Sequence, residues 1–349
     1  WWLAENIQET ENNIRKLNLF SEVKVKQEIS SKGPEFRNLV IELREAQPGS
    51  FEIGPGFRSD LGLRSFARVS YSNFFGKNWI GSMGLEGNRR VNEEYRFIEY
   101  KADAAVIEPR FFGSHFLYSA GISTSKQRFP PDFNASSTRF STGFEHKYFN
   151  DLVTAKLYYK IEHIRQFDVF INGLYSDIDN QKLLIGSLNP SLTYDTRDNP
   201  FTTTRGQVST IGLEYAAPAF SGETVEDSTS TGYYKFNGGI HVYIPVTKDI
   251  VWSNVFSGGY ERSNIVNRPI PLIKLFRLGG YASIRGYTED SINVDAISVR
   301  GTLTLLNFRT QFDLPFVGDL KFAPFFDAGN LFVDKLRNNP FFRAGAGAG

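Results

Sequence analysis

The sequence contains no cysteine among its 349 residues, which excludes a disulfide framework and any cysteine metal site. Its 39 lysines and arginines nearly balance 38 aspartates and glutamates, so a net charge of +1 gives no electrostatic reason to expect a nucleic-acid partner. No apolar run approaches the roughly 18 residues that would indicate a transmembrane helix. The chain begins at Trp1 without a visible signal peptide, and we interpret it as a mature fragment.

Recognisable catalytic motifs are also missing. The sequence has no nucleophile elbow of the GxSxG type and no phosphate-binding P-loop. Its histidines lie far apart and lack metal-ligand spacing; they are His115, His146, His163 and His241. We therefore predict no enzymatic activity, no metal and no cofactor.

Aromatic residues and glycine are abundant. Phe, Trp and Tyr make up 15% of the chain, with 32 Phe and 16 Tyr, and glycine occurs 31 times. Short alternating segments rich in these residues are typical of β-barrels, whose outer bands consume Phe and Tyr.

The first 47 residues differ from the rest. Residues 4–17 carry apolar side chains at helical spacing, whereas residues 23–26 and 39–44 alternate between apolar and polar, as strands do. This order predicts a small α+β unit of helix, strand, turn and strand. A break at Gln47-Pro48-Gly49 sets the predicted boundary, with domains at 1–47 and 48–349.

After residue 50 the pattern has a period of two. Apolar and polar residues alternate in about 14 segments, for example 155–162, 235–244 and 306–313. So many segments exceed one sandwich but suit a barrel, since bacterial barrels run from about 8 to 26 strands. Short turns, such as 245–249, alternate with long loops, such as 263–293. These features predict an all-β fold, a transmembrane antiparallel β-barrel with a wet, polar lumen; the competing interpretation is a large soluble all-β protein.

One tetrapeptide resembles a known family motif. Ile284-Arg285-Gly286-Tyr287 follows a pair of glycines and is similar to the [VI]RG[FY] motif in the sixth extracellular loop of the BamA/TamA superfamily. That superfamily also includes two-partner-secretion transporters and organelle import barrels. Further resemblances occur in the expected order, at 73–76, 108–112, 191–206 and 325–330. Residues 1–46 resemble the last part of a POTRA domain, so the resemblance covers essentially the whole chain.

The resemblance implies a location and a function. It implies a barrel of about 16 strands in the Gram-negative outer membrane, or less expectedly an organelle outer membrane, with this chain lacking the last strands. It further implies an assembly factor that inserts unfolded outer-membrane clients through a lateral gate, in contact with lipids and accessory periplasmic or lipoprotein subunits. The alternative is a two-partner-secretion or autotransporter-type pore, including the barrel of a patatin-like fusion.

Arg285 is the residue with the sharpest predicted role. An unpaired arginine is expensive to bury, and a guanidinium can form a bidentate pair with a carboxylate. The alternation places Asp327 on the lumen face, where the resemblance implies that the loop folds inward and that Arg285 meets this carboxylate. Gln311 stands where many family members have glutamate, and we predict that it hydrogen-bonds Arg285. Without the resemblance, solvated lumen charges would be the simpler interpretation.

Two further sites follow from the same comparison. Asp195, Arg197 and Asp198 belong to a turn motif that the family has in mid-barrel. Phe51 opens the first barrel strand, in which Gly54, Pro55 and Gly56 weaken strand pairing. That weakness fits a gate that adds a client strand, or equally a simple bulge near the periplasmic rim.

Overall fold

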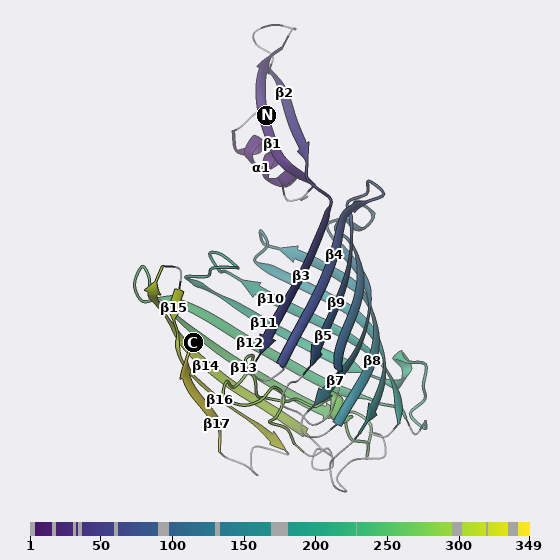
Figure 1. Cartoon of the computed structure of the whole chain (residues 1–349). Helices are drawn as coiled ribbons and strands as arrows, with labels where there is room; N and C mark the ends of the chain where they lie inside the picture. The colour runs from purple at the N-terminus through teal and green to yellow at the C-terminus, as the bar shows by residue number, and fades with distance from the viewer. Residues whose placement is uncertain are drawn as a thin grey trace.

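The fold is seen in a computed structural model (Figure 1) that describes residues 4–15, 19–30, 33, 37–58, 62–89, 98–129, 133–168, 181–227, 229–294, 302–318, 320–333 and 341–349. Its first unit is the helix α1 (Ala4–Arg15) with the antiparallel strands β1 (Phe20–Ile29) and β2 (Arg37–Glu45). Val23 is buried in this unit. Arg15 joins helix to sheet by donating a 2.8 Å hydrogen bond to the Val23 carbonyl oxygen.

No helix in the described part of the chain is long and apolar enough to cross a membrane.

A second, much larger antiparallel sheet starts at Gly49. Its strands are β3 (Gly49–Arg58), β4 (Gly62–Phe74), β5 (Trp79–Arg89), β6 (Ile98–Glu108), β7 (Leu117–Phe129), β8 (Phe133–Tyr148), β9 (Val153–Phe167), β10 (Lys182–Asp195), β11 (Gly206–Ala216), β12 (Tyr233–Pro245), β13 (Val251–Ser263), β14 (Thr302–Val317), β15 (Leu320–Phe322), β16 (Pro324–Val333) and β17 (Arg343–Ala348). Single-turn 3-10 helices lie at Phe111–Gly113 (η1), Pro218–Phe220 (η3) and Leu272–Lys274 (η4).

The strands pair with their neighbours in chain order, from β3 through β14 to β16 and β17, with short β15 beside β14. The sheet curves into an open barrel (Figure 1), and no pairing joins its end strands, β3 and β17, within the described residues. We call the end with short turns, where β2 passes into β3, the turn end. The opposite end, with the longer connections, is the loop end. The predicted all-β antiparallel fold is confirmed.

Register explains the alternating sequence. Lys235 lies opposite Glu261 on β13 and Glu214 on β11, and all three turn to the inside. The residues between them face outward, as Phe236 does with 45% of its surface exposed. Because side chains alternate across a strand, a period of two places charges on one face and apolar groups on the other.

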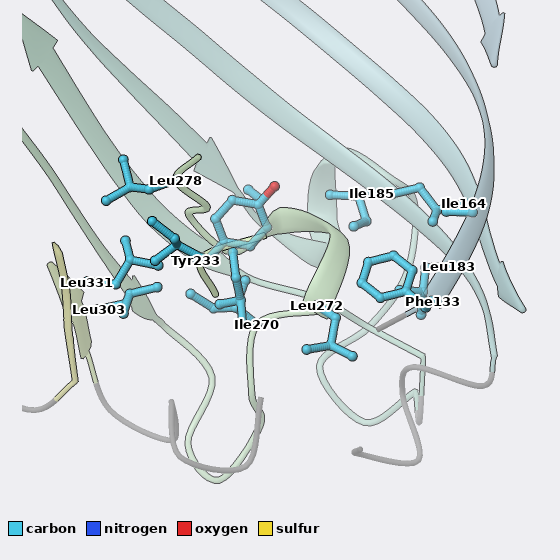
Figure 2. Packing of buried hydrophobic residues seen from close by; sticks show 14 of the residues in the cluster. Phe133, Ile164, Leu183, Ile185, Tyr233, Ile270, Leu272, Leu278, Leu303 and Leu331 are labelled. Carbon is cyan, nitrogen blue, oxygen red and sulfur yellow. The ribbon is translucent and has the colours of Figure 1, made fainter. Parts of the chain in front are cut away.

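The interior of the loop end is not the wet, polar lumen that we predict from the alternation. Inward residues of β8 to β16 and of the loop after β13 form a buried apolar cluster there (Figure 2). Its strand members include Phe133, Ile164, Leu183, Tyr233, Leu303 and Leu331, and its loop members include Ile270, Leu272, Leu278 and Ile284. The expectation fails here because a long loop supplies apolar side chains that cover those of the wall.

The strand β3 also differs from one of the two interpretations of its sequence. It pairs with β4 residue by residue from Gly49 to Arg58, without a register shift. Gly54, Pro55 and Gly56 lie opposite Phe66, Ser65 and Arg64, towards the loop end. The alternative of a bulge near the periplasmic rim is therefore wrong; Phe51 faces outward at the turn end and is 65% exposed.

Candidate functional site: an inward loop and its anchors

The loop after β13 enters the barrel and is described from residue 264 to residue 294. It holds η4 and then doubles back, because Leu278 and Ile292 exchange two backbone hydrogen bonds of 2.9 Å. Leu272 and Ile284 are fully buried. Burying side chains of this size contributes about 1.5–3 kcal/mol each, so the apolar contacts alone favour docking of the loop.

Glycines shape the motif at the tip of this loop. Gly279, Gly280 and Gly286 have φ angles of 109°, 89° and 93°, a region that residues with a Cβ rarely adopt. The Ser283 hydroxyl accepts a 2.7 Å hydrogen bond from the Gly279 N–H and donates to the Gly279 carbonyl oxygen at 2.9 Å. This tight turn presents Arg285 to the wall, whereas Tyr287 remains 36% exposed.

Arg285 meets the two lumen partners that we predict for it. Its Nε and Nη2 donate to Asp327 Oδ2 and Oδ1 at 2.7 and 2.8 Å, and its backbone N–H donates to Oδ2 at 3.0 Å. Its Nη1 donates to Gln311 Oε1 at 2.6 Å. Asp327 is fully buried, and the Arg285 side chain is 13% exposed. A carboxylate so far from water depends on these charge-assisted hydrogen bonds.

The structure adds contacts around this pair that we do not predict from the sequence. The Phe325 ring centre lies 3.6 Å from the Arg285 guanidinium carbon, a cation–π contact. Arg309 Nε lies 3.7 Å from Asp327 Oδ1, so this one carboxylate serves two cations. A Cβ added to Gly345 on β17 would overlap the Arg285 carbonyl oxygen. Phe325 and Arg309 lie on the same inward face of their strands as Asp327 and Gln311, so the alternation of the sequence could have indicated these two contacts. No feature of the sequence indicates the close approach at Gly345.

A second anchor, Lys274, lies earlier in the same loop. Lys274 Nζ, at the end of η4, contacts Glu162 Oε2 on β9 at 2.5 Å and Glu214 Oε1 on β11 at 3.8 Å. The other oxygen of Glu162 accepts a 2.9 Å hydrogen bond from Arg139 on β8. The Lys274 and Glu162 side chains are 12% and 5% exposed. Partners 112 residues apart therefore form a nearly dry ion pair that no motif indicates.

Backbone groups of the loop are bound on both sides of Lys274. The Ile273 N–H donates to Gln166 Oε1 at 3.1 Å, and the Phe276 N–H donates to Glu261 Oε1 at 3.0 Å. Lys235 donates to the Lys274 carbonyl oxygen and lies 4.2 Å from the centre of the Phe276 ring. The wall thus satisfies loop groups that would otherwise be buried without partners.

The turn between β10 and β11 is a separate unit at the turn end. Arg197 donates to both oxygens of Asp195, at 2.9 and 2.6 Å. Asp198 Oδ1 accepts the N–H groups of Asn199 and Thr204 at 2.9 and 3.0 Å, and its Oδ2 accepts the Thr204 hydroxyl at 2.5 Å. The contacts found for these carboxylates close the turn, and the structure does not bring them to the inward loop.

Asp198 gives this turn a predictable response to acid. The Thr204 hydroxyl and surrounding N–H groups hold the pKa of Asp198 well below its ordinary value. A lowered pKa in the folded state stabilises the turn above the unfolded pKa of about 3.9 and loses this contribution as the pH falls through the folded value. At pH 6, we expect the Thr204 N–H to be better protected from hydrogen exchange in the wild type than in Asp198→Asn. This difference in protection should become smaller as the pH is lowered. A gap independent of pH would contradict this account.

The charged residues of the site attach the loop to the barrel wall. Across the described ranges, no three His, Cys, Asp or Glu side chains are grouped so that they can hold a metal ion. The buried charges bind one another across the loop and the wall. Fold and site together define an antiparallel barrel whose interior holds a loop pinned by a buried arginine–carboxylate pair.

The chain belongs to the Omp85 superfamily, whose superfamily domain matches residues 73–349. This match confirms the resemblance drawn from the motifs. BamA from Haemophilus ducreyi lacking POTRA domains 1–3 has a similar fold, with a TM-score of 0.73 and 17% identity, over 99% of this chain and 72% of that one.

Two other solved structures share the fold. CdiB from Acinetobacter baumannii has a TM-score of 0.58 and 12% identity, over 98% of this chain and 61% of that one. CdiB from Escherichia coli has a TM-score of 0.52 and 16% identity, over 93% of this chain and 63% of that one. This chain therefore spans less than two thirds of either CdiB chain.

Proposed function

We propose that this protein lies in the Gram-negative outer membrane and assembles other β-barrel proteins there. Membership of the Omp85 superfamily supports the location, and the outward apolar face of the sheet suits contact with lipid. The N-terminal α+β unit is, on this proposal, the end of a POTRA domain in the periplasm. The turn end then faces the periplasm and the loop end faces the outside.

The docked loop is the observation that carries the choice of function. The apolar cluster and the anchors at Asp327 and Glu162 hold the loop inside the barrel. A chain passing through the lumen would have to displace them all. Insertion at the edge of the sheet avoids that step, because a client strand can pair with free backbone groups of an end strand.

The strand β3 is the edge that we propose for this gate. It pairs only with β4 within the described residues and presents Phe51, Ile53 and Phe57 outward, at 65%, 72% and 68% exposure. Pro55 contributes no N–H to a ladder, and Gly54 and Gly56 add no large side chain to hold the strand in place. Unfolded outer-membrane proteins are the proposed clients, with lipids and accessory periplasmic or lipoprotein subunits as further partners.

The second candidate is a secretion pore for one partner or passenger protein. The similarity to CdiB shows the fold alone and does not separate the two functions. On this alternative, the docked loop must leave the interior during transport.

Depletion of the full-length protein in its own organism separates these candidates. For an assembly factor, we expect many outer-membrane barrels to decline together in quantitative proteomics, with their unfolded chains accumulating in the periplasm. Loss of a single secreted protein, with other barrels unchanged, would overturn the proposal in favour of the pore. The set of affected proteins therefore distinguishes an assembly factor from a secretion pore.

A further inference from the structure

The outer face of the sheet carries an apolar groove across β4 to β8. Its volume is about 640 Å³, within the range of pockets that hold small molecules. Ala104 on β6 and Ala120 on β7 form the floor, and Tyr71, Phe74 and Phe140 are among the larger residues around it. The lining is almost entirely apolar, so the chemistry that fits it is a hydrocarbon chain.

The groove follows from the order of residue sizes along neighbouring strands. Met83, Ala104, Ile122 and Phe140 occupy successive cross-strand positions on the outward face. A small residue therefore lies between large ones and leaves a hollow. Other outward positions, such as Leu157 on β9 and Ile211 on β11, carry large side chains that are 52% and 61% exposed.

Aromatic turns border the same face at the turn end. Phe75, Phe112 and Phe149 are 85%, 89% and 76% exposed. The three residues have φ angles of 55°, 48° and 54°, a backbone conformation that is energetically costly for a bulky side chain. The same costly conformation occurs in three neighbouring turns.

Two of these rings, Phe75 and Phe112, continue the outward face of the barrel. Phe75 lies 6.0 Å from Phe74, which lines the groove, and Phe112 lies 4.5 Å from Phe111. Phe111 in turn contacts the outward Phe144 at 5.2 Å. Exposed aromatic rings at this level are typical of the boundary between hydrocarbon and headgroups. The groove therefore runs towards a headgroup layer at the turn end.

Charged residues at this border indicate the headgroup. Lys77, in the turn after β4, lies 5.9 Å from the Trp79 ring centre and is exposed, as is Arg110 after β6. Glu108, at the end of β6, lies on the outward face with Ala104. Two cations suit a phosphate, and a carboxylate suits an ammonium group.

We propose that the groove binds one acyl chain of a zwitterionic glycerophospholipid, with its phosphate beside Lys77 and Arg110 and its ammonium beside Glu108. Such a site uses the lipid-facing wall and is independent of whether the barrel assembles clients or secretes a partner.

Native mass spectrometry of the full-length protein with added phosphatidylethanolamine tests the acyl-chain site. Ala104→Phe fills the groove, and Ala155→Phe makes the same change on the outward face of β9, outside it. We expect the wild type and Ala155→Phe to retain one lipid and Ala104→Phe to retain it about tenfold less, the change expected when roughly two methylene groups lose their contact. Equal retention by all three proteins, or no retained lipid in the wild type, would overturn the site.

Folding and headgroup selection are checked separately. Heat-dependent gel mobility shows whether each variant is folded, and Ala120→Leu replaces Ala104→Phe if the latter is not. We expect Glu108→Gln to lower the preference for phosphatidylethanolamine over phosphatidylglycerol. An unchanged preference would show that the headgroup assignment is wrong.

Discussion

Asp327→Asn is expected to release the tip of the inward loop and to abolish most of the protein's activity. The substitution keeps the shape of the side chain but removes the only carboxylate that contacts both Arg285 and Arg309 within the described residues. Breaking a buried pair by removing one partner costs about 3–5 kcal/mol, so the undocked population should rise between about a hundredfold and several thousandfold. Proteolysis within residues 278–287, measured beside the client assembly proposed above, reports both effects.

Arg285→Met should have the smaller effect of the two. It leaves Asp327 with Arg309, whereas Asp327→Asn leaves two cations without their shared carboxylate. Glu145→Gln is the control, because its carboxylate also faces inward but pairs at 2.8 Å with Lys156 on the neighbouring strand β9. Unchanged proteolysis and activity in Asp327→Asn would show that the pair does not hold the loop.

Lys274→Met is expected to free the earlier part of the loop while the tip stays docked. The change removes the cation that contacts both Glu162 and Glu214 and leaves Glu162 with Arg139. At the penalty of roughly 3 kcal/mol for breaking a buried pair, hydrogen exchange of the Ile273 and Phe276 N–H groups should accelerate about a hundredfold. Mass-spectrometric exchange resolved by segment checks this result.

A nearby lysine provides the control for the second anchor. Lys160 also faces inward, but its ammonium donates to Asn189 on β10 at 2.9 Å, so Lys160→Met removes a lumen charge without a loop contact. The double variant Lys274→Met with Arg285→Met should make the loop more sensitive to protease than either single change does, although its buried apolar side chains still favour docking. If Lys274→Met instead loosened the tip as much as Arg285→Met does, the two anchors would not be separate attachments.

The predicted elements were correct where a local pattern decides the structure. Alternation in 235–244 is sufficient to place Phe236 outside and Lys235 inside, because successive side chains of a strand point to opposite faces. The same alternation, together with the motif around Arg285, predicts Asp327 and Gln311 as the inward partners of Arg285. The regular register at Pro55 argues against a bulge there, and only the strand pairing could show this.

Contacts between distant segments were out of reach of that reasoning. Nothing near Lys274 indicates that a carboxylate 112 residues earlier is its partner. The apolar cluster at the loop end was missed for a related reason. The loop was assigned by its polar residues, but it also carries Ile270, Leu272 and Leu278 at spacings without a strand or helix period.

Local sequence is sufficient to show which face of each strand is apolar and, through the loop motif, to single out Arg285 as the charge that needs a partner. Each of these depends on residues close together in the chain. Only the folded chain shows that the loop docks through two buried ion pairs, that apolar side chains pack beside it at the loop end, and that small residues on β6 and β7 leave a groove outside. Those features depend on strand register and curvature, which bring together residues that are far apart in the chain.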